Sequence, residues 1–317
     1  MQHLSSGQRM ENNSSGEVVC FGVLSYLQLM VVDQVPVHNQ GTPISQLTDS
    51  YGDDAAIVAG MLHQWGQKTM LIPSAVGDDE LGRKVADTVF NLGVPVSVVV
   101  DPMVSTVAEI SIADPSGART YFYHRTPELL DTLDAADLAP LVNAAYLYVD
   151  WYDGDHILRP MREASRLGVP VLVNLEDQHA NSELLFKLLP FSTVCQVSAD
   201  RSDKGDGLES IADGLLEAGV GTVLVTGGRR GCLVADAGQK VRVSAPQVDV
   251  VDGNGAGSAF SAGFIYASLR GWDLERSARF ATVQSSLKCG VPGYTVATVA
   301  EAQRLAAELP VDVNKRI

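Results

Sequence analysis

The stretch Asp252-Gly-Asn-Gly-Ala-Gly-Ser-Ala-Phe260 is a glycine-rich turn that leads directly into a helical pattern of small apolar residues, Ala259–Leu269. Its glycines permit a tight turn. The backbone N–H groups of Gly255, Ala256 and Gly257 are expected to point out of the helix N-terminus, where the helix dipole favours a bound anion. The alternative is a turn that only packs tightly, because short glycine motifs also recur by chance.

Composition and charge restrict the class of protein. The chain has 317 residues, 46% hydrophobic and 19% charged, which is typical of one large α/β domain or of one domain with an appended lobe. A net charge of −15 argues against nucleic acid as a partner. No apolar run approaches the roughly 20 residues needed to span a bilayer. We therefore expect a cytoplasmic protein that binds a small molecule.

The polar segment 1–17 lacks the apolar core of a signal peptide and is predicted to be a disordered leader, which leaves 18–317 as the folded domain. The cysteines are far apart and mostly lie in apolar contexts, so we predict reduced core thiols at Cys20, Cys195, Cys232 and Cys289. The spacing of the histidines does not predict a metal site; they are scattered as His38, His63, His124, His156 and His179.

Short apolar, β-rich runs alternate with helical patterns along the chain. The expected strands are Val18–Phe21, Thr69–Ile72, Ala145–Val149, Val169–Val173, Thr193–Val197 and Thr222–Val225. The expected helices are Ala55–Trp65, Glu80–Leu92, Ile157–Leu167, Ser182–Leu188 and Leu208–Ala218. This order predicts a doubly wound, mostly parallel sheet flanked by helices, with ligands at the carboxyl ends of its strands.

Two stretches, about 28–47 and 98–125, interrupt that alternation. The second alternates from Thr106 to Ala113, turns at 114–117 and continues as a strand through Tyr123, which predicts a hairpin outside the main sheet. Such a small β-lobe is either a lid over a ligand crevice or a flap for dimerisation. At its end, His124 and Arg125 could reach a bound anion.

Four motifs in order give the chain a family resemblance. Gly22 follows the first strand, Ala75–Gly82 follows the second, Thr226-Gly-Gly-Arg-Arg-Gly231 is similar to a nucleotide-site turn, and Asp252–Phe260 is similar to a catalytic anion hole. The chain resembles the ribokinase-like (PfkB) carbohydrate and nucleoside kinases from Val18 to about Glu308. The resemblance implies ATP with Mg²⁺ along the carboxyl edge of the sheet and phosphoryl transfer to a sugar or nucleoside under the β-lid. It also implies a homodimer through that lid.

The resemblance also implies site residues. The anion hole would comprise Asp252, Gly255, Ala256 and Gly257, with Ser258 at the position of the catalytic base. Nucleotide binding would involve Thr226, Gly228, Gly231 and Asn254. The substrate would meet Leu27, Gly52, Asp53, Asp54, Ile57 and Glu109.

Several of these positions depart from the family pattern. Ser258 stands where the family has the aspartate that takes the proton from the acceptor hydroxyl, and loss of a general base typically costs about 10²–10⁴ in rate. Leu27 replaces an aspartate and Ile57 an asparagine, so neither can pair with a sugar hydroxyl. Ordinary sugar-kinase activity is therefore expected to be weak or altered.

The residues expected to organise Mg²⁺ also differ. Asn174 stands where the family often has aspartate, and 196–201 replaces the Asn-x-x-Glu motif. Only Glu176 or Asp200 could partly replace the missing carboxylate, acting through water.

Two functions remain open. One is an ATP-dependent small-molecule kinase in which a substitute carboxylate or a solvent path replaces the base. Asp53 and Asp54 are candidates for a relocated base or for binding an amine-bearing ligand, although they could equally be solvated residues at a helix entry. The alternative is a catalytically inactive pseudokinase that acts as a nucleotide or metabolite sensor or binds a protein partner.

Overall fold

The computed structural model describes residues 15–114, 119–200 and 207–315, so most of the predicted leader 1–17 lies outside the described residues. Its centre is a nine-stranded sheet with the order β13-β12-β11-β10-β9-β8-β7-β1-β4. Six strands are parallel and correspond to the six predicted from the sequence: β1 (Glu17–Gly22), β4 (Thr69–Pro73), β7 (Ala144–Asp150), β8 (Val171–Asn174), β9 (Val194–Ser198) and β10 (Thr222–Thr226). Three antiparallel strands extend the sheet: β11 (Cys232–Asp236), β12 (Gln239–Val243) and β13 (Val311–Lys315).

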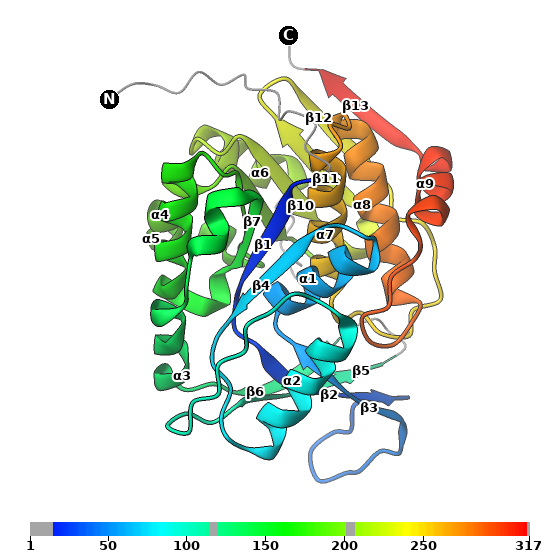
Figure 1. The fold of residues 1–317 in the computed structure, drawn as a ribbon. Coiled ribbons are helices and arrows are strands. Elements are labelled where there is room, and N and C mark those ends of the chain that lie inside the picture. The colour runs from blue at the N-terminus through cyan, green and yellow to red at the C-terminus, as the bar shows by residue number, and fades with distance from the viewer. Residues whose placement is uncertain (1–14, 115–118, 201–206, 316–317) are drawn as a thin grey trace.

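Helices cover both faces of this sheet (Figure 1). One face packs against α1 (Asp54–Gln64), α2 (Glu80–Leu92), α7 (Ala256–Leu269), α8 (Leu274–Cys289) and α9 (Val299–Glu308). The other packs against α3 (Pro127–Asp131), α4 (Leu158–Leu167), α5 (Ser182–Leu188) and α6 (Leu208–Glu217). Each face forms its own hydrophobic core, as the nearly continuous apolar strands require. The predicted doubly wound fold is confirmed.

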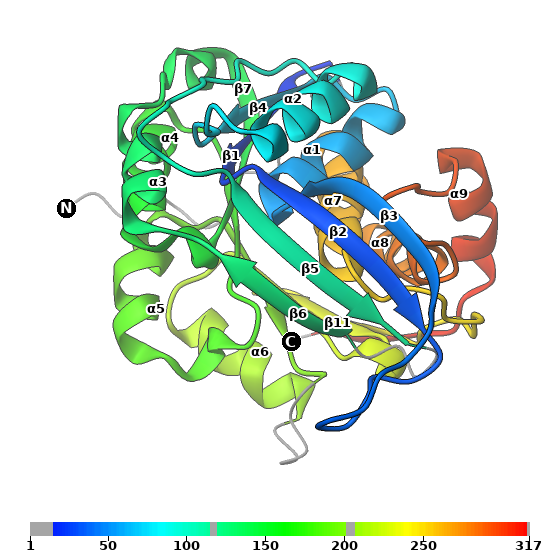
Figure 2. The same ribbon diagram turned by 90° about the horizontal axis from the view of Figure 1, so that it is seen from below.

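A second sheet of four strands has the order β3-β2-β5-β6 and lies across one end of the molecule (Figure 2). Its strands are β2 (Ser25–Val32), β3 (Ile44–Gly52), β5 (Val107–Ala113) and β6 (Arg119–His124). β5 and β6 form the antiparallel pair expected from the alternation, although the turn between them lies almost wholly outside the described residues. Leu27 pairs with Glu109, and Glu109 with Tyr123, so these three side chains share one face of the sheet.

The cysteines have no disulfide partner: Cys20, Cys195 and Cys232 are buried and Cys289 is partly buried. Burial raises the pKa of each of these thiols, that of Cys232 to about 11. Among the described residues, no helix is long and apolar enough to cross a membrane.

Helices α7 and α8 pack so closely that a glycine is required between them. A Cβ atom at Gly263 would lie 2.9 Å from the Cα atom of Ala281. We expect Gly263→Ala to lower the free energy of unfolding by about 1–3 kcal/mol, because the helices must separate. Chemical denaturation measures this change.

Gly214 in α6 supplies the matched control. A Cβ atom there meets nothing within 4 Å. Gly214→Ala should therefore raise stability by about 0.5–1 kcal/mol, since alanine has the higher helix propensity. Equal effects of the two substitutions would contradict the packing explanation.

Candidate active site

Helix α7 begins three residues earlier than the predicted Ala259, so the glycine-rich turn forms its first turn. Gly255 is the N-cap residue with φ 74°, and no side chain of a described residue caps the helix there. A Cβ atom on Gly255 would lie 2.9 Å from the ring of Tyr294. Of the three predicted amides, that of Ala256 makes a long bond of 3.4 Å to the carbonyl oxygen of Gly253. An uncapped helix N-terminus of this kind suits an anion.

A buried ion pair holds the turn in place. Lys288 Nζ lies 2.9 Å from Asp252 Oδ2 and 2.8 Å from the carbonyl oxygen of Asp252, and neither side chain is exposed. The Asp252 carboxylate also accepts hydrogen bonds from the N–H groups of Asn254 and Gly293. Asp252, predicted as part of the catalytic motif, does not line either of the cavities described below. Its contacts position the turn.

The first cavity, of about 280 Å³, lies between α1, α7 and the four-stranded sheet. It brings together most of the predicted substrate and anion-hole residues: Leu27, Asp53, Asp54, Ile57, Glu109, Gly255, Gly257 and Ser258. Gly52 is the exception among the predicted substrate residues. It ends β3, where a Cβ atom would meet Ser25 Oγ at 2.4 Å and Glu109 Oε2 at 3.0 Å. Gly52 therefore permits close packing behind the cavity instead of lining it.

The second cavity, of about 410 Å³, lies at the carboxyl ends of β9 and β10. It is lined by three of the four residues predicted to bind nucleotide, Thr226, Gly228 and Gly231. The fourth, Asn254, lines the first cavity, where its amide donates to Tyr294 Oη at 3.0 Å. Arg119 and Gly257 line both cavities, so the two meet at the N-terminus of α7.

Ser258 and Asp54 form a hydrogen-bonded pair at this meeting point. Ser258 lines the first cavity but is fully buried, and its hydroxyl donates a short hydrogen bond to Asp54 Oδ1. Burial, followed by the charge of Glu176, raises the pKa of Asp54 to about 6, while the Ser258 hydrogen bond and Arg119 oppose that rise. Asp54 is thus a carboxylate on the cavity wall directly beside the position where the family has its base.

Arg125 holds three carboxylates under the lid. Its guanidinium forms a close ion pair with Asp53 and lies 3.1 Å from Asp153 and 3.8 Å from Glu109. The side chains of Arg125 and Asp53 are each only 10% exposed. The interpretation of Asp53 as a solvated helix-entry residue is therefore wrong. Arg125 is already neutralised, and His124 is exposed and lines neither cavity, so the predicted anion contact by this pair finds no support.

The backbone at Asp53 is strained. Its φ of 67° and ψ of 143° fall in a region that glycine adopts and other residues avoid at a cost of about 1–3 kcal/mol. The resemblance aligns Gly52-Asp-Asp-Ala-Ala-Ile57 with a Gly-Gly-Asn-Ala-Ala-Asn-like helix entry, so Asp53 stands at the position of the second glycine. Asp53 adopts the backbone angles that a glycine would adopt without strain, and its carboxylate lines the cavity. This combination of strain and a cavity-lining charge indicates a functional role.

Carboxylate and amide side chains also face the second cavity. Glu176 lines it, adopts φ 47°, and accepts a 3.2 Å hydrogen bond from Asn174, which also donates to Asp150 at 2.7 Å. Gln196 occupies the start of the altered Asn-x-x-Glu motif and donates to the carbonyl oxygen of Gly257 at 3.0 Å. Mg²⁺ needs only one or two protein carboxylates when phosphates and waters complete its shell. Glu176, together with Asp200 in the same cavity, provides such a set.

Sequence reasoning missed the tyrosines of β6 and one cation. Tyr121 and Tyr123 line the first cavity from β6, and Tyr121 Oη lies 2.9 Å from Oη of Tyr152 on the opposite wall. Arg119, two residues before Tyr121 on the same face of β6, lies 3.8 Å from Glu176. The alternation of β6 as 119, 121 and 123 was the available signal, because one face of the strand points at the ligand.

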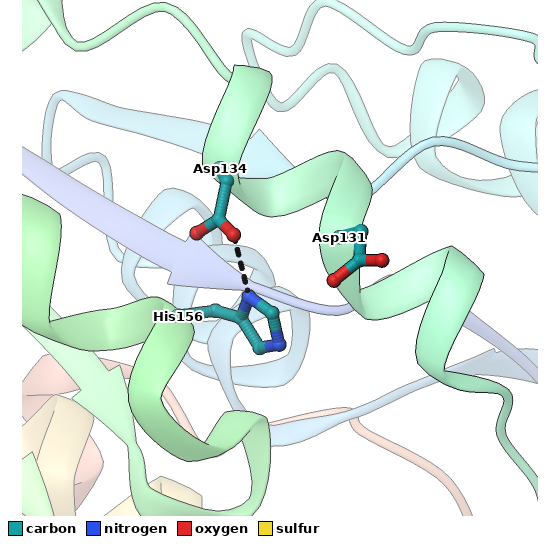
Figure 3. A group of neighbouring side chains, drawn as sticks. All are labelled: Asp131, Asp134 and His156. Carbon is teal, nitrogen blue, oxygen red and sulfur yellow. Dashed lines mark hydrogen bonds and ion pairs between the residues drawn. The ribbon is translucent and has the colours of Figure 1, made fainter.

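A separate group of possible metal ligands lies outside both cavities (Figure 3). His156 Nδ1 lies 3.0 Å from Asp134 Oδ2, and Asp131 offers an oxygen within 4.8 Å of both ligand atoms. Asp131 and Asp134 are exposed. Sequence spacing could not find this group because His156 comes from the 3₁₀ segment after β7 (Trp151–Ile157). The prediction of no metal site there stays a prediction.

Two cavities therefore meet at the uncapped N-terminus of α7; the second lies beside Gly228 and Gly231, and the first lies under the four-stranded sheet. Residues 15–300 match the model for the pfkB family carbohydrate kinases. The chain belongs to this family.

Known proteins agree with this assignment. The chain is 26% identical to a nucleoside kinase of Methanothermobacter thermautotrophicus over 278 residues, 85% of this chain and 88% of that protein. A structure from Agrobacterium tumefaciens, provisionally described as a ribokinase, superposes with a TM-score of 0.81 at 22% identity and covers 93% and 98% of the two chains. A ribokinase of Arabidopsis thaliana, complexed with ribose and ATP, gives 0.70 at 17% identity and covers 92% and 99%.

The Asp252–Lys288 pair predicts a large effect on stability. Lys288→Met would leave the Asp252 carboxylate buried without a cation, and we expect the free energy of unfolding to fall by about 3–5 kcal/mol. Urea denaturation monitored by circular dichroism measures the loss.

The control for this substitution is Arg304→Met. Arg304 pairs with Glu308 at 3.8 Å, but these side chains are 65% and 70% exposed. Loss of that pair should cost less than about 1 kcal/mol. If Lys288→Met were no more damaging than Arg304→Met, the buried pair would not be what holds the turn.

Proposed function

We propose that this protein transfers the γ-phosphoryl group of ATP to a hydroxyl of a small molecule held in the first cavity, with Asp54 as the proton acceptor. The observation that carries the proposal is the hydrogen bond of Ser258 to Asp54 at the point where the cavities meet. A serine at this position cannot itself act as a base near neutral pH. The carboxylate needed for that role comes from α1.

The second cavity supports ATP as the donor. Its turn contains Gly228 and Gly231, whose φ angles of 56° and 83° favour glycine, and the N-terminus of α7 favours an anion next to it. The Arabidopsis relative is complexed with ATP. Glu176 and Asp200 would hold Mg²⁺ there, and the ion would neutralise charge on the phosphates when bound.

Different residues of the chain would bind the phosphoryl group and accept the proton. The amides of the α7 first turn orient the phosphoryl oxygens, and Arg119, which lines both cavities, adds positive charge beside them. As the acceptor oxygen bonds to phosphorus, the bond from phosphorus to the leaving ADP oxygen breaks. The acceptor O–H proton passes to Asp54, and Ser258 keeps that carboxylate oriented through its hydrogen bond.

The walls of the first cavity favour an acceptor with a ring that can stack. Leu27 and Ile57 supply an apolar side, and Tyr121, Tyr123 and Tyr152 supply aromatic surfaces. The relative from Methanothermobacter thermautotrophicus is named a nucleoside kinase. A sugar or nucleoside bound chiefly through its ring therefore fits this cavity better than a polyol held by the usual aspartate.

A catalytically inactive sensor is the second candidate. Ser258 is fully buried. Gln196 stands at the asparagine position of the expected Asn-x-x-Glu motif, and its side chain donates a hydrogen bond to the α7 backbone.

A homodimer through the lid is compatible with either candidate, since Ile110 and Phe122 are 37% and 60% exposed on the outer face of the four-stranded sheet.

Removal of the Asp54 carboxylate tests the proposed base. Asp54→Asn keeps the shape of the side chain but cannot accept the proton, so kcat should fall about 10²–10⁴-fold while ATP binding persists. A coupled assay for ADP on a panel of nucleosides and sugars measures turnover, and calorimetry measures ATP binding.

Two substitutions at Ser258 complete this experiment. Ser258→Ala removes the orienting hydroxyl but leaves the carboxylate, and should cost less than Asp54→Asn. Ser258→Asp should bring no gain, because it places a second carboxylate beside Asp54. A large gain from Ser258→Asp, or no turnover by the wild type across the panel, would favour the inactive sensor.

The pH dependence of turnover follows from the state of Asp54. The carboxyl must be ionised to accept a proton, and its pKa is raised to about 6. We expect kcat/KM to fall about tenfold per pH unit below pH 6 and to level off above it. A profile that stays flat from pH 5 to 7, with stability checked in parallel, would rule out Asp54 as the base.

A further inference from the structure

We propose that the acceptor carries a protonated amine, bound by Asp53 and Glu109 beneath the lid. This inference rests on the proposed function in taking the first cavity as the acceptor site. It deepens that function by assigning the chemical class of the acceptor.

Three carboxyl groups share the one positive charge of the cluster around Arg125, so their full ionisation would leave an excess of negative charge. Burial and the charge of Asp53 accordingly raise the pKa of Glu109 and raise that of Asp153 to about 7. Asp53, Glu109 and Asp153 all lie within 3.8 Å of the single guanidinium of Arg125. Asp153 is placed behind the cavity wall, where it also accepts a hydrogen bond from the N–H of Val23. Asp53 and Glu109 line the cavity itself. A cationic ligand would supply the missing charge, whereas an anionic one would add to the excess.

Unpaired acceptor atoms point to the same ligand. The side chain of Asp53 is nine-tenths buried, and no amide, hydroxyl or cationic group of the described residues donates to its Oδ2. The contact of Asp53 with Glu109 brings two carboxyl groups together, which raises the pKa of Glu109. Ser111 Oγ, two residues after Glu109 on the same face of β5, is also buried without a partner in the described part of the chain. Buried polar atoms are normally satisfied, so these atoms await donors. An ammonium group brings three N–H donors and the required charge together.

The neighbouring side chains suit a cation. Tyr123 lies opposite Glu109 in the sheet, and Tyr121 lies opposite Ser111. Both tyrosines line the cavity, and aromatic faces attract cations. Leu27 pairs with Glu109 on the other side of that strand, and its apolar side chain offers no further acceptor for the N–H groups of an ammonium ligand.

The raised pKa of Glu109 provides a second measurable consequence of the proposal, the release of a proton on binding. Burial and the charge of Asp53 raise the pKa of Glu109 well above its usual range, Arg125 opposes the rise, and Asp54 adds to it. Tyr123, opposite Glu109 in the sheet, and Tyr294 line the same cavity, and burial raises the pKa of Tyr294. A bound ammonium group favours the ionised carboxylate and would lower this raised pKa, so we expect amine binding to be accompanied by proton release from Glu109.

Calorimetry without ATP tests the proposal on matched probes. One set is glucosamine, glucose and N-acetylglucosamine, and the other is 3′-amino-3′-deoxyadenosine and adenosine. We expect at least one amine to bind tenfold or more tightly than its neutral counterpart. Its binding enthalpy should differ between buffers of different ionisation enthalpy, as proton release requires.

Variants locate the effect. Asp53→Asn should abolish the preference for the amine, and Glu109→Gln should abolish the proton release; thermal unfolding of each variant confirms that it is folded. Asp78→Asn is the matched control, because Asp78 is 68% exposed and lines neither cavity. It should leave both signatures unchanged.

The outcomes separate this inference from the proposed function. Neutral probes that bind as tightly as the amines, no binding by any probe, or an amine preference that survives Asp53→Asn would each overturn the inference. Phosphoryl transfer is assayed independently. An amine preference without phosphoryl transfer would support the inference and refute the kinase proposal. Transfer to neutral acceptors alone would support the kinase proposal and refute the inference.

Discussion

The buried ion pair between Asp252 and Lys288 is the constraint on which the site depends. It joins the start of the glycine-rich turn to α8, and Asp252 also fixes the N–H groups of Asn254 and Gly293. A charge pair with no exposed surface is costly to desolvate and more costly to break. The turn is therefore held rigidly at the point where α7 begins. Both cavities take part of their wall from that first turn, so the pair sets their relative position.

Most of the fold could be predicted because its signals are local. The six parallel strands are short apolar runs buried on both faces, and helical patterns separate most of them along the chain. The start of α7 was misplaced at Ala259 because glycine has low helix propensity, whereas the structure begins the helix at Ala256. Tertiary packing against α8 overrides that propensity, and the absence of a Cβ atom at Gly263 permits the packing.

The candidate site was predictable where a motif carried it. The glycine turns, together with Leu27, Ile57 and Ser258, were placed from motif order alone, and the structure brings the last three into one cavity. Contacts between distant segments could not be read in this way. The partnership of Asp54 with Ser258 joins residues 204 positions apart, and the cluster around Arg125 joins three separate segments. Gly52 packs behind the first cavity and Asn254 lines the first cavity instead of the second, and residue spacing does not encode such differences.

Two residues that depart from the family pattern, Ser258 and Leu27, each have a carboxylate as a neighbour in space. Where the resemblance places the base, Ser258 has lost the carboxylate, but Asp54 brings one to its hydroxyl. Where it places the substrate aspartate, Leu27 is apolar, but its neighbour in the sheet is Glu109, which lines the same cavity. Random decay of a catalytic site would remove carboxylates without restoring them, since a buried carboxylate costs free energy unless it has a partner. Here Glu109 keeps a carboxylate that the resemblance implies, Asp53 and Asp54 add two more, and Asp53 does so in a strained backbone conformation. The free-energy cost of these buried carboxylates and of the strained backbone is not expected in a site that has only lost its function. It favours a site adapted to a different acceptor.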